Sequence, residues 1–327
     1  MKAIVYSKYG GPDVLEFKDI DKPVPGAGEV LVRVHAAALN AYDWHLLTAD
    51  IFLVRLMGGG LFKPKTRVPG ADIAGRVEAV GPNAGRFQPG DAVFGDIAGS
   101  GGGGLAEFAR ARERALAPMP AGLSFEEAAA APMAALTALQ ALRDKGRIQA
   151  GKKVLINGAS GGVGTFAVQI AKTFGADVTA VCSPGNMDQA RSLGADHVID
   201  YTREDFTRRA ERYDLILAAN GYHPISAYKR ALAPGGVYVM AGGAPAQMLQ
   251  AALLGPWLSI FGGKKMGMVS AKASEKDLIT IGELLETRRI VSAIDRRYPL
   301  EEAREAFRYF GEGHARGKVI ITVGHHE

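Results

Sequence analysis

Two patterns of hydrophobic and polar positions divide the chain near residue 124. Before it, short runs rich in β-branched residues are separated by turns containing glycine, proline or asparagine, which is typical of β-strands. The apolar alternation within these runs is imperfect, which predicts an irregular barrel. The expected strands are KAIVYS, EVLVRVHAAAL, IAGRVEAVG, DAVFGD and LAEFARA.

From Ser124 onward, helical and strand patterns alternate. Ser124 and Glu127 have the spacing of a capping box, Pro132 is expected to divide the helical run that follows, and Gly146 is a stop signal. Apolar strands then alternate with helices from KKVLING to VYVMAGG, which predicts a parallel sheet covered on both faces. Near the end, LEEAREAFRYFGEG predicts a helix and GKVIITV a strand.

Composition excludes several classes of protein. The 327 residues are 47% hydrophobic and 22% charged, as in globular proteins, and the net charge of +5 is dispersed, so no nucleic-acid partner is expected. The single cysteine, Cys182, excludes an internal disulfide and a cysteine-rich zinc site and fits a cytoplasmic location. The N-terminus has no apolar core of signal-peptide length. No membrane span is expected, because the most apolar stretch, residues 248–263, is short and contains Gly255 and Pro256.

A glycine pattern between an expected strand and an expected helix predicts a phosphate-binding loop. Gly158, Gly161 and Gly164 permit a tight turn and a close approach of the backbone to a pyrophosphate, and the helix offers free N–H groups. The alternative is a glycine-rich turn without a ligand. The other residues of this expected cofactor-binding loop are Ala159, Ser160, Gly162 and Val163.

The end of the next expected strand favours NADPH over NADH. An acidic residue there would bind a ribose 2′-hydroxyl, but the segment CSPGN carries no carboxylate and would not repel a 2′-phosphate. Ser183 and Asn186 are the expected contacts. The alternative is that they only shape a turn, and no arginine or lysine lies between Cys182 and Ala190.

Several motifs, in this order, resemble the medium-chain dehydrogenase/reductases, and more closely their zinc-free quinone oxidoreductase branch. The motifs span essentially the whole chain: VPGADIAGRVEAVGPNAGRFQPGDAVFG, NGASGGVG, LGADHVIDY and ARGKVIITV. The resemblance implies an α/β protein with two domains. A GroES-like β-barrel catalytic domain would comprise residues 1–123 and 294–327, and a Rossmann-type, doubly wound parallel-sheet cofactor domain residues 124–293.

The same resemblance implies a site without zinc. Zinc-dependent relatives carry a cysteine where this chain has Asn40, a His-Glu pair in place of Ala71–Asp72, and a third ligand near Met133. A tetrahedral site needs three or four well-placed ligands. We therefore expect no metal; the alternative is a fortuitous site made by Asp43, Asp72 and His45.

The stretch AALNAYDWH is expected to form a loop over the nicotinamide. By resemblance, Asn40 would present its amide to a substrate carbonyl or a ribose, and Asp43 would hold the loop geometry. Tyr42, His45 or solvent could donate a proton. Tyr42, Trp44 and His45 have an equally plain interpretation as structural residues.

Further cofactor contacts follow from the resemblance. Thr137 would lie near the nicotinamide carboxamide, unless its hydroxyl bonds to its own helix backbone, and Tyr201 beside the adenosine phosphate. Gly242 and Gly243 end a strand at the edge of the sheet where ligands bind. Two positions depart from the family pattern: the usual basic residue near 185 or 186 is missing, and Ala218 replaces a frequent aspartate.

These observations predict an NADPH-dependent, zinc-independent oxidoreductase that transfers hydride to a quinone or an α,β-unsaturated carbonyl. The alternatives are an alcohol dehydrogenase-like enzyme and a non-catalytic NADPH-binding or scaffold protein. We expect a homodimer. Trp257 and Phe261 are expected to line the acceptor pocket; their apolar segment could instead be core, subunit interface or a membrane-surface contact.

Overall fold

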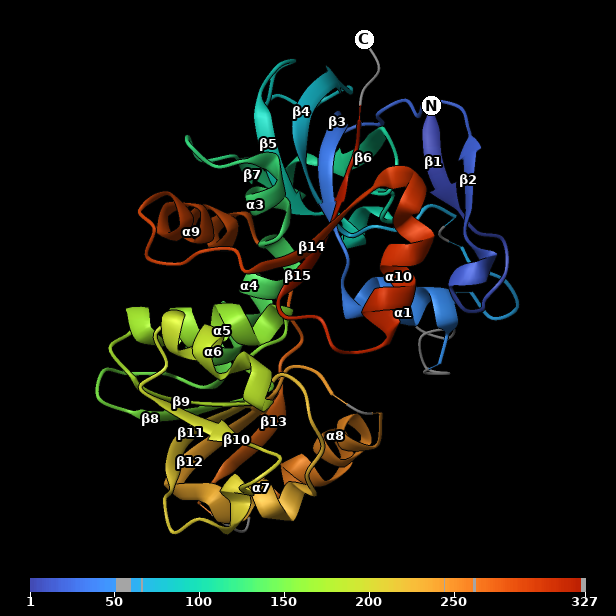
Figure 1. Ribbon diagram of the computed structural model, residues 1–327. Helices are drawn as coiled ribbons and strands as arrows, with labels where there is room; N and C mark the ends of the chain where they lie inside the picture. The colour runs from blue at the N-terminus through green and yellow to red at the C-terminus, as the bar shows by residue number, and fades with distance from the viewer. Residues whose placement is uncertain (51–59, 66, 244, 261–262, 325–327) are drawn as a thin grey trace. The chain divides into compact units, whose positions relative to one another are not determined.

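The computed structural model describes residues 1–50, 60–65, 67–243, 245–260 and 263–324 (Figure 1). These residues form two compact units, each built from more than one stretch of the chain. The first unit comprises Met1–Met133, Ala273–Arg288 and Ser292–Glu327, and the second comprises Ala134–Lys272 and Arg289–Val291. Phe261 lies outside the described residues.

The first unit is built around a mixed seven-stranded sheet in the order β14-β15-β3-β4-β5-β7, with β6 also pairing with β3. A separate two-stranded sheet joins β1 and β2. Strand β15 runs antiparallel to β3, so the closing strand of the chain is part of the barrel sheet. The strands are β1 Lys2–Val5, β2 Glu16–Asp19, β3 Glu29–Ala38, β4 Asp72–Val80, β5 Ala92–Asp96, β6 Phe108–Arg112, β7 Leu116–Pro118, β14 Ile294–Pro299 and β15 Lys318–Thr322.

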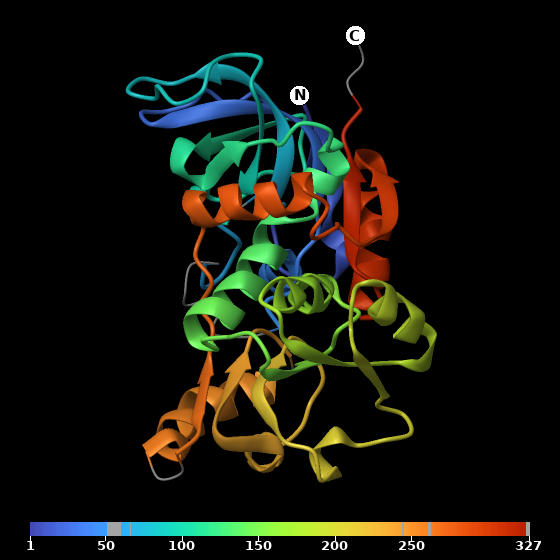
Figure 2. The same cartoon turned by 90° about the vertical axis from the view of Figure 1, so that its left-hand side faces the viewer.

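Helices surround this barrel. Helix α10, Ala303–Gly311, supplies Ala303, Ala306 and Phe307 to the core of the barrel. Helix α9, Glu275–Glu286, lies beside β7 (Figure 2). The short helix α3, Phe125–Ala129, begins with the expected capping box, because the Ser124 hydroxyl accepts from the Glu127 N–H and the Glu127 carboxylate accepts from the Ser124 N–H.

The stretch expected to be a loop is a helix, and this corrects the sequence-based expectation. Helix α1 spans Ala41–Thr48, directly after Asn40. The Asp43 carboxylate accepts a hydrogen bond from the Asn40 N–H at 3.0 Å and one from the Gly70 N–H at 3.0 Å. A carboxylate in the first helical turn satisfies a free N–H group and favours the positive end of the helix dipole, which explains why the helix forms here.

The second unit contains the expected parallel sheet. Its six strands run in the order β10-β9-β8-β11-β12-β13, and every neighbouring pair is parallel. Counted along the chain this is the order 3-2-1-4-5-6 of the Rossmann fold, in which ligands bind where the winding reverses, between the first and fourth strands. The strands are β8 Lys153–Asn157, β9 Asp177–Cys182, β10 His197–Asp200, β11 Tyr213–Ala218, β12 Leu232–Met240 and β13 Lys265–Met268.

Helices cover both faces of this sheet, with α5 and α6 on one side and α7 and α8 on the other (Figure 1). Pro132 starts a new helix, as expected, and Gly146 ends the π-helical turn that follows α4. The helices are α4 Pro132–Gln140, α5 Gly162–Thr173, α6 Met187–Ser192, α7 Ile225–Ala231 and α8 Pro245–Ile260.

The division into units differs from the expected boundaries at two places. Residues 124–133 and α9 group with the barrel rather than with the parallel sheet. The reason is packing: α3 lies against β3 and β4, and at Gly282 of α9 an added Cβ would meet Pro120 at 3.0 Å and Phe94 at 3.7 Å. The sequence between the last strand of the cofactor sheet and the closing helix carries no local sign of this contact.

Candidate functional site

The expected phosphate loop joins β8 to α5 in the second unit. Gly158 has φ +79°, which favours glycine, and its N–H donates to Val181 O of the neighbouring strand at 3.2 Å. A Cβ on Gly164 would lie 2.1 Å from Gly158 O, so only glycine fits there. The first hydrogen bond of α5 joins Thr165 N–H to Gly161 O. The N–H groups before it have no acceptor within the helix and can bind a pyrophosphate.

The turn after β9 places Ser183 and Asn186 in contact. The Asn186 Nδ2 donates to Ser183 Oγ at 3.0 Å, and the Asn186 N–H donates to Ser183 O at 3.0 Å. These bonds shape the turn, which agrees with the alternative that Ser183 and Asn186 have a structural role. They also leave the Ser183 hydroxyl hydrogen free to donate, because its oxygen acts as acceptor. Asn186 itself is buried, and its Oδ1 has no partner among the described residues.

The remaining expected cofactor contacts lie at carboxyl ends of the sheet or on α4. Tyr201 follows β10, is exposed, and its N–H donates to Cys182 O, so it lies next to the Ser183 turn. Gly242 follows β12, where a Cβ would lie 2.6 Å from Ala219 O, and Gly243 has φ +124°. Thr137 on α4 is buried, and its hydroxyl makes no hydrogen bond within the described residues, so it does not show the backbone bond of the alternative interpretation.

In the first unit, a buried cluster gathers around Asn40. Lys318 Nζ donates to Asn40 Oδ1 at 2.5 Å and lies 3.3 Å from Asp72 Oδ2. The Asn40 Nδ2 donates to Asp72 Oδ2 at 3.0 Å and to Ala38 O at 3.2 Å. The Met133 N–H donates to Asp72 Oδ1 at 2.9 Å. We call Asn40, Asp43, Asp72, Asp96 and Lys318 the acid–lysine cluster.

This geometry bears on the role expected for Asn40. Both N–H groups of its amide already have acceptors in the protein, and its oxygen is bonded to Lys318. To donate to a substrate carbonyl, the amide would have to give up one of these bonds. The structure therefore shows Asn40 as part of the support of the cluster, and its direct contact with a substrate stays a prediction.

Burial and mutual repulsion raise the pKa values of the carboxyls of the cluster. Burial, reinforced by the neighbouring Asp72, raises the pKa of Asp43 to about 7 and the pKa of Asp96 to about 7. Burial also raises the pKa of Asp72, although the Lys318 ammonium and the bond from Asn40 oppose it. The Lys318 ammonium favours the ionised form of all three carboxyls.

Lys318 and Asp96 are absent from the candidates that the sequence supplied. Lys318 begins the strand KVIIT, whose first four residues are all buried. A charged residue in such a run must be paired, because an unpaired buried charge costs several kcal/mol, about 3–5 when a partner is removed. The lysine at the start of this apolar run was therefore the signal in the sequence that could have indicated a buried ion pair. The aspartate at the end of AVFGD carried none, since its neighbours in space come from distant parts of the chain.

The two candidate proton donors differ in their surroundings. Tyr42 on α1 is half-exposed, and burial together with the nearby Asp43 and Asp96 raises its pKa. His45 contacts Asp50 through Nδ1 at 2.8 Å. Trp44 packs against the barrel core and fits closely over Gly311, where a Cβ would lie 2.2 Å from its ring. Trp44 is therefore structural, as the plain interpretation predicted.

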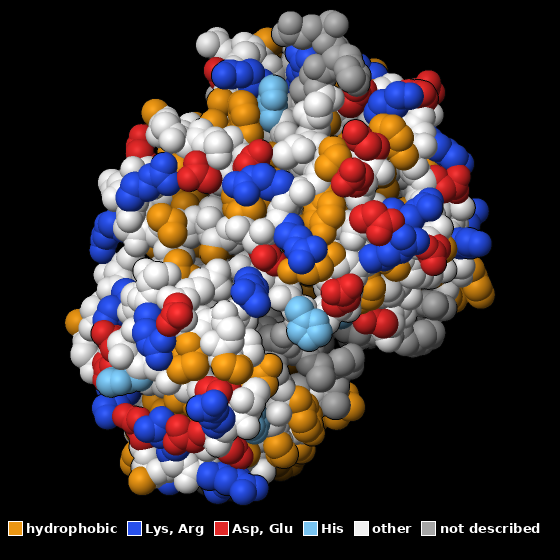
Figure 3. Space-filling model, in the orientation of Figure 1, with side chains coloured by type: hydrophobic (Ala, Val, Ile, Leu, Met, Phe, Trp, Pro, Cys, Tyr) orange, Lys and Arg blue, Asp and Glu red, His pale blue; other side chains and the backbone are white. Residues whose placement is uncertain are grey.

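The apolar segment near residue 257 is mostly at the surface. Figure 3 shows apolar side chains gathered over α8. Trp257 is 67% exposed, and Leu249, Leu253 and Leu254 are also exposed. The interpretation of Leu253, Leu254 and Trp257 as buried core is therefore wrong. The described helices include none that is long and apolar enough to cross a bilayer.

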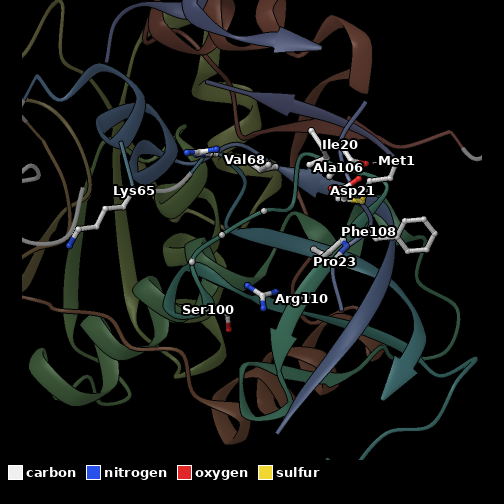
Figure 4. Close-up of a pocket in the computed structure, with 15 residues that line it drawn as sticks. Met1, Ile20, Asp21, Pro23, Lys65, Val68, Ser100, Ala106, Phe108 and Arg110 are labelled. Carbon is white, nitrogen blue, oxygen red and sulfur yellow. Dashed lines mark hydrogen bonds between the residues drawn. The ribbon is translucent and has the colours of Figure 1, made fainter. Parts of the chain in front are cut away.

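A groove of about 540 Å³ opens elsewhere on the first unit (Figure 4). Its lining comes from the N-terminal strands and the glycine-rich loop 100–103, with charges from Asp21, Lys65, Arg67 and Arg110. It contains no residue of the acid–lysine cluster and none of the residues predicted from the sequence. Nothing in its lining points to a particular ligand.

The acid–lysine cluster does not offer the donors that zinc requires. The oxygens of Asn40 and Asp72 are bonded to the Lys318 ammonium. The backbone N–H of Met133 donates to Asp72 Oδ1, and an N–H group cannot serve as a metal ligand. Throughout the described part of the chain, no group of three or more His, Cys, Asp or Glu side chains could hold a metal ion.

Comparison with known proteins identifies the fold as that of a dehydrogenase family. Residues 26–121 match the family model described as "Alcohol dehydrogenase GroES-like domain", and residues 193–321 match "Zinc-binding dehydrogenase". The quinone-oxidoreductase QR1 of Triphysaria versicolor is 33% identical over 333 residues, with 98% of each chain covered. The 2-methylene-furan-3-one reductase of Solanum lycopersicum is 35% identical over 336 residues, which cover 98% of this chain and 79% of the relative.

The chain belongs to the medium-chain dehydrogenase/reductase superfamily, as the sequence motifs predicted. The quinone oxidoreductase of Coxiella burnetii superposes with a TM-score of 0.88 at 29% identity, covering 99% of both chains. Within the superfamily the protein lies in the quinone oxidoreductase-like branch. It is therefore an oxidoreductase of this family, with a GroES-like domain and a Rossmann-type domain, and the family implies a nicotinamide cofactor.

Proposed function

We propose that this protein is an NADPH-dependent, zinc-independent reductase of quinones or α,β-unsaturated carbonyls. The observation that carries the proposal is the acid–lysine cluster: Asn40 and Asp72, which by the resemblance stand where zinc-dependent relatives carry a cysteine and the glutamate of a His-Glu pair, are bonded to the Lys318 ammonium. A site without a strong Lewis acid suits acceptors that are already activated towards hydride. The relatives named as a quinone-oxidoreductase and a furanone reductase support this choice.

The residues of the second unit fit a dinucleotide. The N-terminus of α5 and the close turn at Gly158 and Gly164 would hold the pyrophosphate, and the Ser183 hydroxyl would donate to a 2′-phosphate. When bound, the cofactor supplies a hydride from C4 of its dihydronicotinamide. The protein has to orient the acceptor, exclude water and stabilise negative charge on the acceptor oxygen.

The test is a steady-state assay of NADPH oxidation by the purified protein with simple quinones, enones and aldehydes, together with NADP⁺ reduction by alcohols. We expect turnover with quinones or enones, less than one zinc per chain by elemental analysis, and activity that survives strong chelators. Turnover confined to alcohols, with one zinc per chain, would instead identify the alcohol dehydrogenase-like alternative that the family descriptions suggest. NADPH binding without turnover of any acceptor would indicate the non-catalytic alternative.

We also propose that the exposed side chain of Trp257 contributes to acceptor selection and that the protein is a homodimer. The first proposal is motivated by the large apolar side chains that α8 leaves in contact with water. It is tested by the relative kcat/KM of the Trp257→Ala variant with small and bulky quinones. The second is tested by light scattering of the purified protein.

A further inference from the structure

The end of three neighbouring strands of the barrel sheet carries an unusual buried lysine. Lys318 is the first residue of β15, Asp72 is the first residue of β4, and Asn40 follows β3, which lies between them. The Leu39 N–H donates to Val319 O, which fixes the two chain segments side by side. Lys318 is 3% exposed, Asp72 is fully buried and Asn40 is buried.

The Lys318 ammonium has more donors than acceptors. An ammonium group carries three N–H bonds. Within the part of the chain that the structure describes, Lys318 Nζ has two acceptors, Asn40 Oδ1 and Asp72 Oδ2. Lys172, a partly exposed lysine of the second unit, has three: both carboxylate oxygens of Asp196 and the Ala176 carbonyl. A buried donor without an acceptor is costly, so the third N–H of Lys318 calls for an oxygen that the described residues do not supply.

The surroundings of Lys318 hold its side-chain nitrogen in a fixed position. The Lys318 ammonium interacts electrostatically with three buried carboxyls, those of Asp43, Asp72 and Asp96. Its hydrogen bonds to Asn40 and Asp72 fix the position of Nζ. An ammonium fixed in this way needs little reorganisation when negative charge appears beside it. This property is what stabilises an oxyanion in a protein site.

We propose that Lys318 is a catalytic residue of the reductase, whose third N–H donates to the carbonyl oxygen of the bound acceptor. This role rests on the proposed function. In the reaction, the acceptor gains a hydride at carbon from NADPH, which is oxidised to NADP⁺, and the π electron pair of the acceptor moves to its carbonyl oxygen. The Lys318 ammonium stabilises that oxyanion, and one proton from solvent completes the reduction. Asn40 and Asp72 are positioning residues, because they hold Nζ.

The test separates this role from a structural one by removing the positive charge of Lys318 either alone or together with the negative charge of Asp72. Lys318→Met leaves Asp72 without its cation, so the variant is expected to lose stability. The double variant Asp72→Asn/Lys318→Met removes both charges and should be more stable than the single variant. Lys172→Met removes a lysine from an ion pair outside the cluster and is the matched control, with unchanged kcat.

We expect the double variant to bind NADPH with a dissociation constant within about twofold of that of the wild type, and to show a kcat for a quinone or enone lower by roughly 100-fold or more, as when one oxyanion donor is removed. Recovery of kcat together with stability in the double variant would show that the lysine is only structural. A weaker binding of NADPH with unchanged kcat would assign the third N–H to the cofactor and also overturn the proposal. A wild-type protein that reduces no acceptor would overturn the proposed function itself, and this role with it.

Discussion

Two glycines of the phosphate loop allow its role to be tested by substitution with alanine. At Gly164 a Cβ would lie 2.1 Å from Gly158 O and 2.7 Å from Ala159 Cα, so the backbone must move to accept it. Overpacking of this kind costs about 1–3 kcal/mol of stability. At Gly161 a Cβ would meet only Gly158 O, at 3.7 Å, and φ is −80°, an ordinary value for any residue.

The two variants therefore predict different combinations of stability and binding. Gly164→Ala should lower the free energy of unfolding by about 1–3 kcal/mol and weaken NADPH binding, because the loop that it displaces holds the pyrophosphate. Gly161→Ala should change the free energy of unfolding by less than about 1 kcal/mol. It should nevertheless weaken NADPH binding by about tenfold or more, because its methyl group enters the space that a pyrophosphate needs beside the helix N-terminus.

The assay combines urea denaturation with a titration of NADPH followed by fluorescence. If Gly161→Ala binds NADPH as tightly as the wild type does, the backbone does not approach the pyrophosphate there, and the assignment of the phosphate loop fails. If Gly164→Ala is as stable as the wild type, the close contact with Gly158 does not hold the loop in its conformation.

Three further predictions test the cofactor, the buried carboxyls and the exposed helix. Replacing Ser183 with Asp should reverse a wild-type preference for NADPH over NADH, measured as two dissociation constants, because a carboxylate repels a 2′-phosphate and accepts from a 2′-hydroxyl; equal constants in the wild type would contradict the NADPH assignment. Asp96 keeps its proton in the folded chain up to pH about 7, but in the unfolded chain only up to pH about 4, so the free energy of unfolding should fall as the pH rises between these values. Asp96→Asn should reduce that fall by on the order of 1 kcal/mol or more, and denaturation curves with the same pH dependence as the wild type would show that Asp96 does not hold a proton there. Trp257→Ala should change the free energy of unfolding by less than about 0.5 kcal/mol, since the side chain is 67% exposed, and a larger loss would place it in a contact that the structure does not contain.

Local signals in the sequence were sufficient for most of the elements and for the tight glycine turn between β8 and α5. The capping box at Ser124, the break at Pro132 and the glycines between β8 and α5 act on neighbouring residues, and the structure confirms each of them. The strand–helix alternation predicted the parallel sheet for a similar reason, because a parallel pair needs a crossover between its strands. At Asn40 the local signal was misinterpreted: the aspartate three residues later starts a helix, where a loop was expected.

The composition of the acid–lysine cluster and the surface of α8 were decided by tertiary structure. Lys318 and Asn40 are 278 positions apart, and only the pairing of β15 with β3 brings them together. Strand pairing depends on register and on the burial of whole faces, so no short stretch of sequence contains it. The exposure of Leu253, Leu254 and Trp257 on α8 was also not predictable from the local sequence. A short apolar run has the same pattern in a core and on an exposed face, and only the packing of neighbouring elements determines whether it is buried.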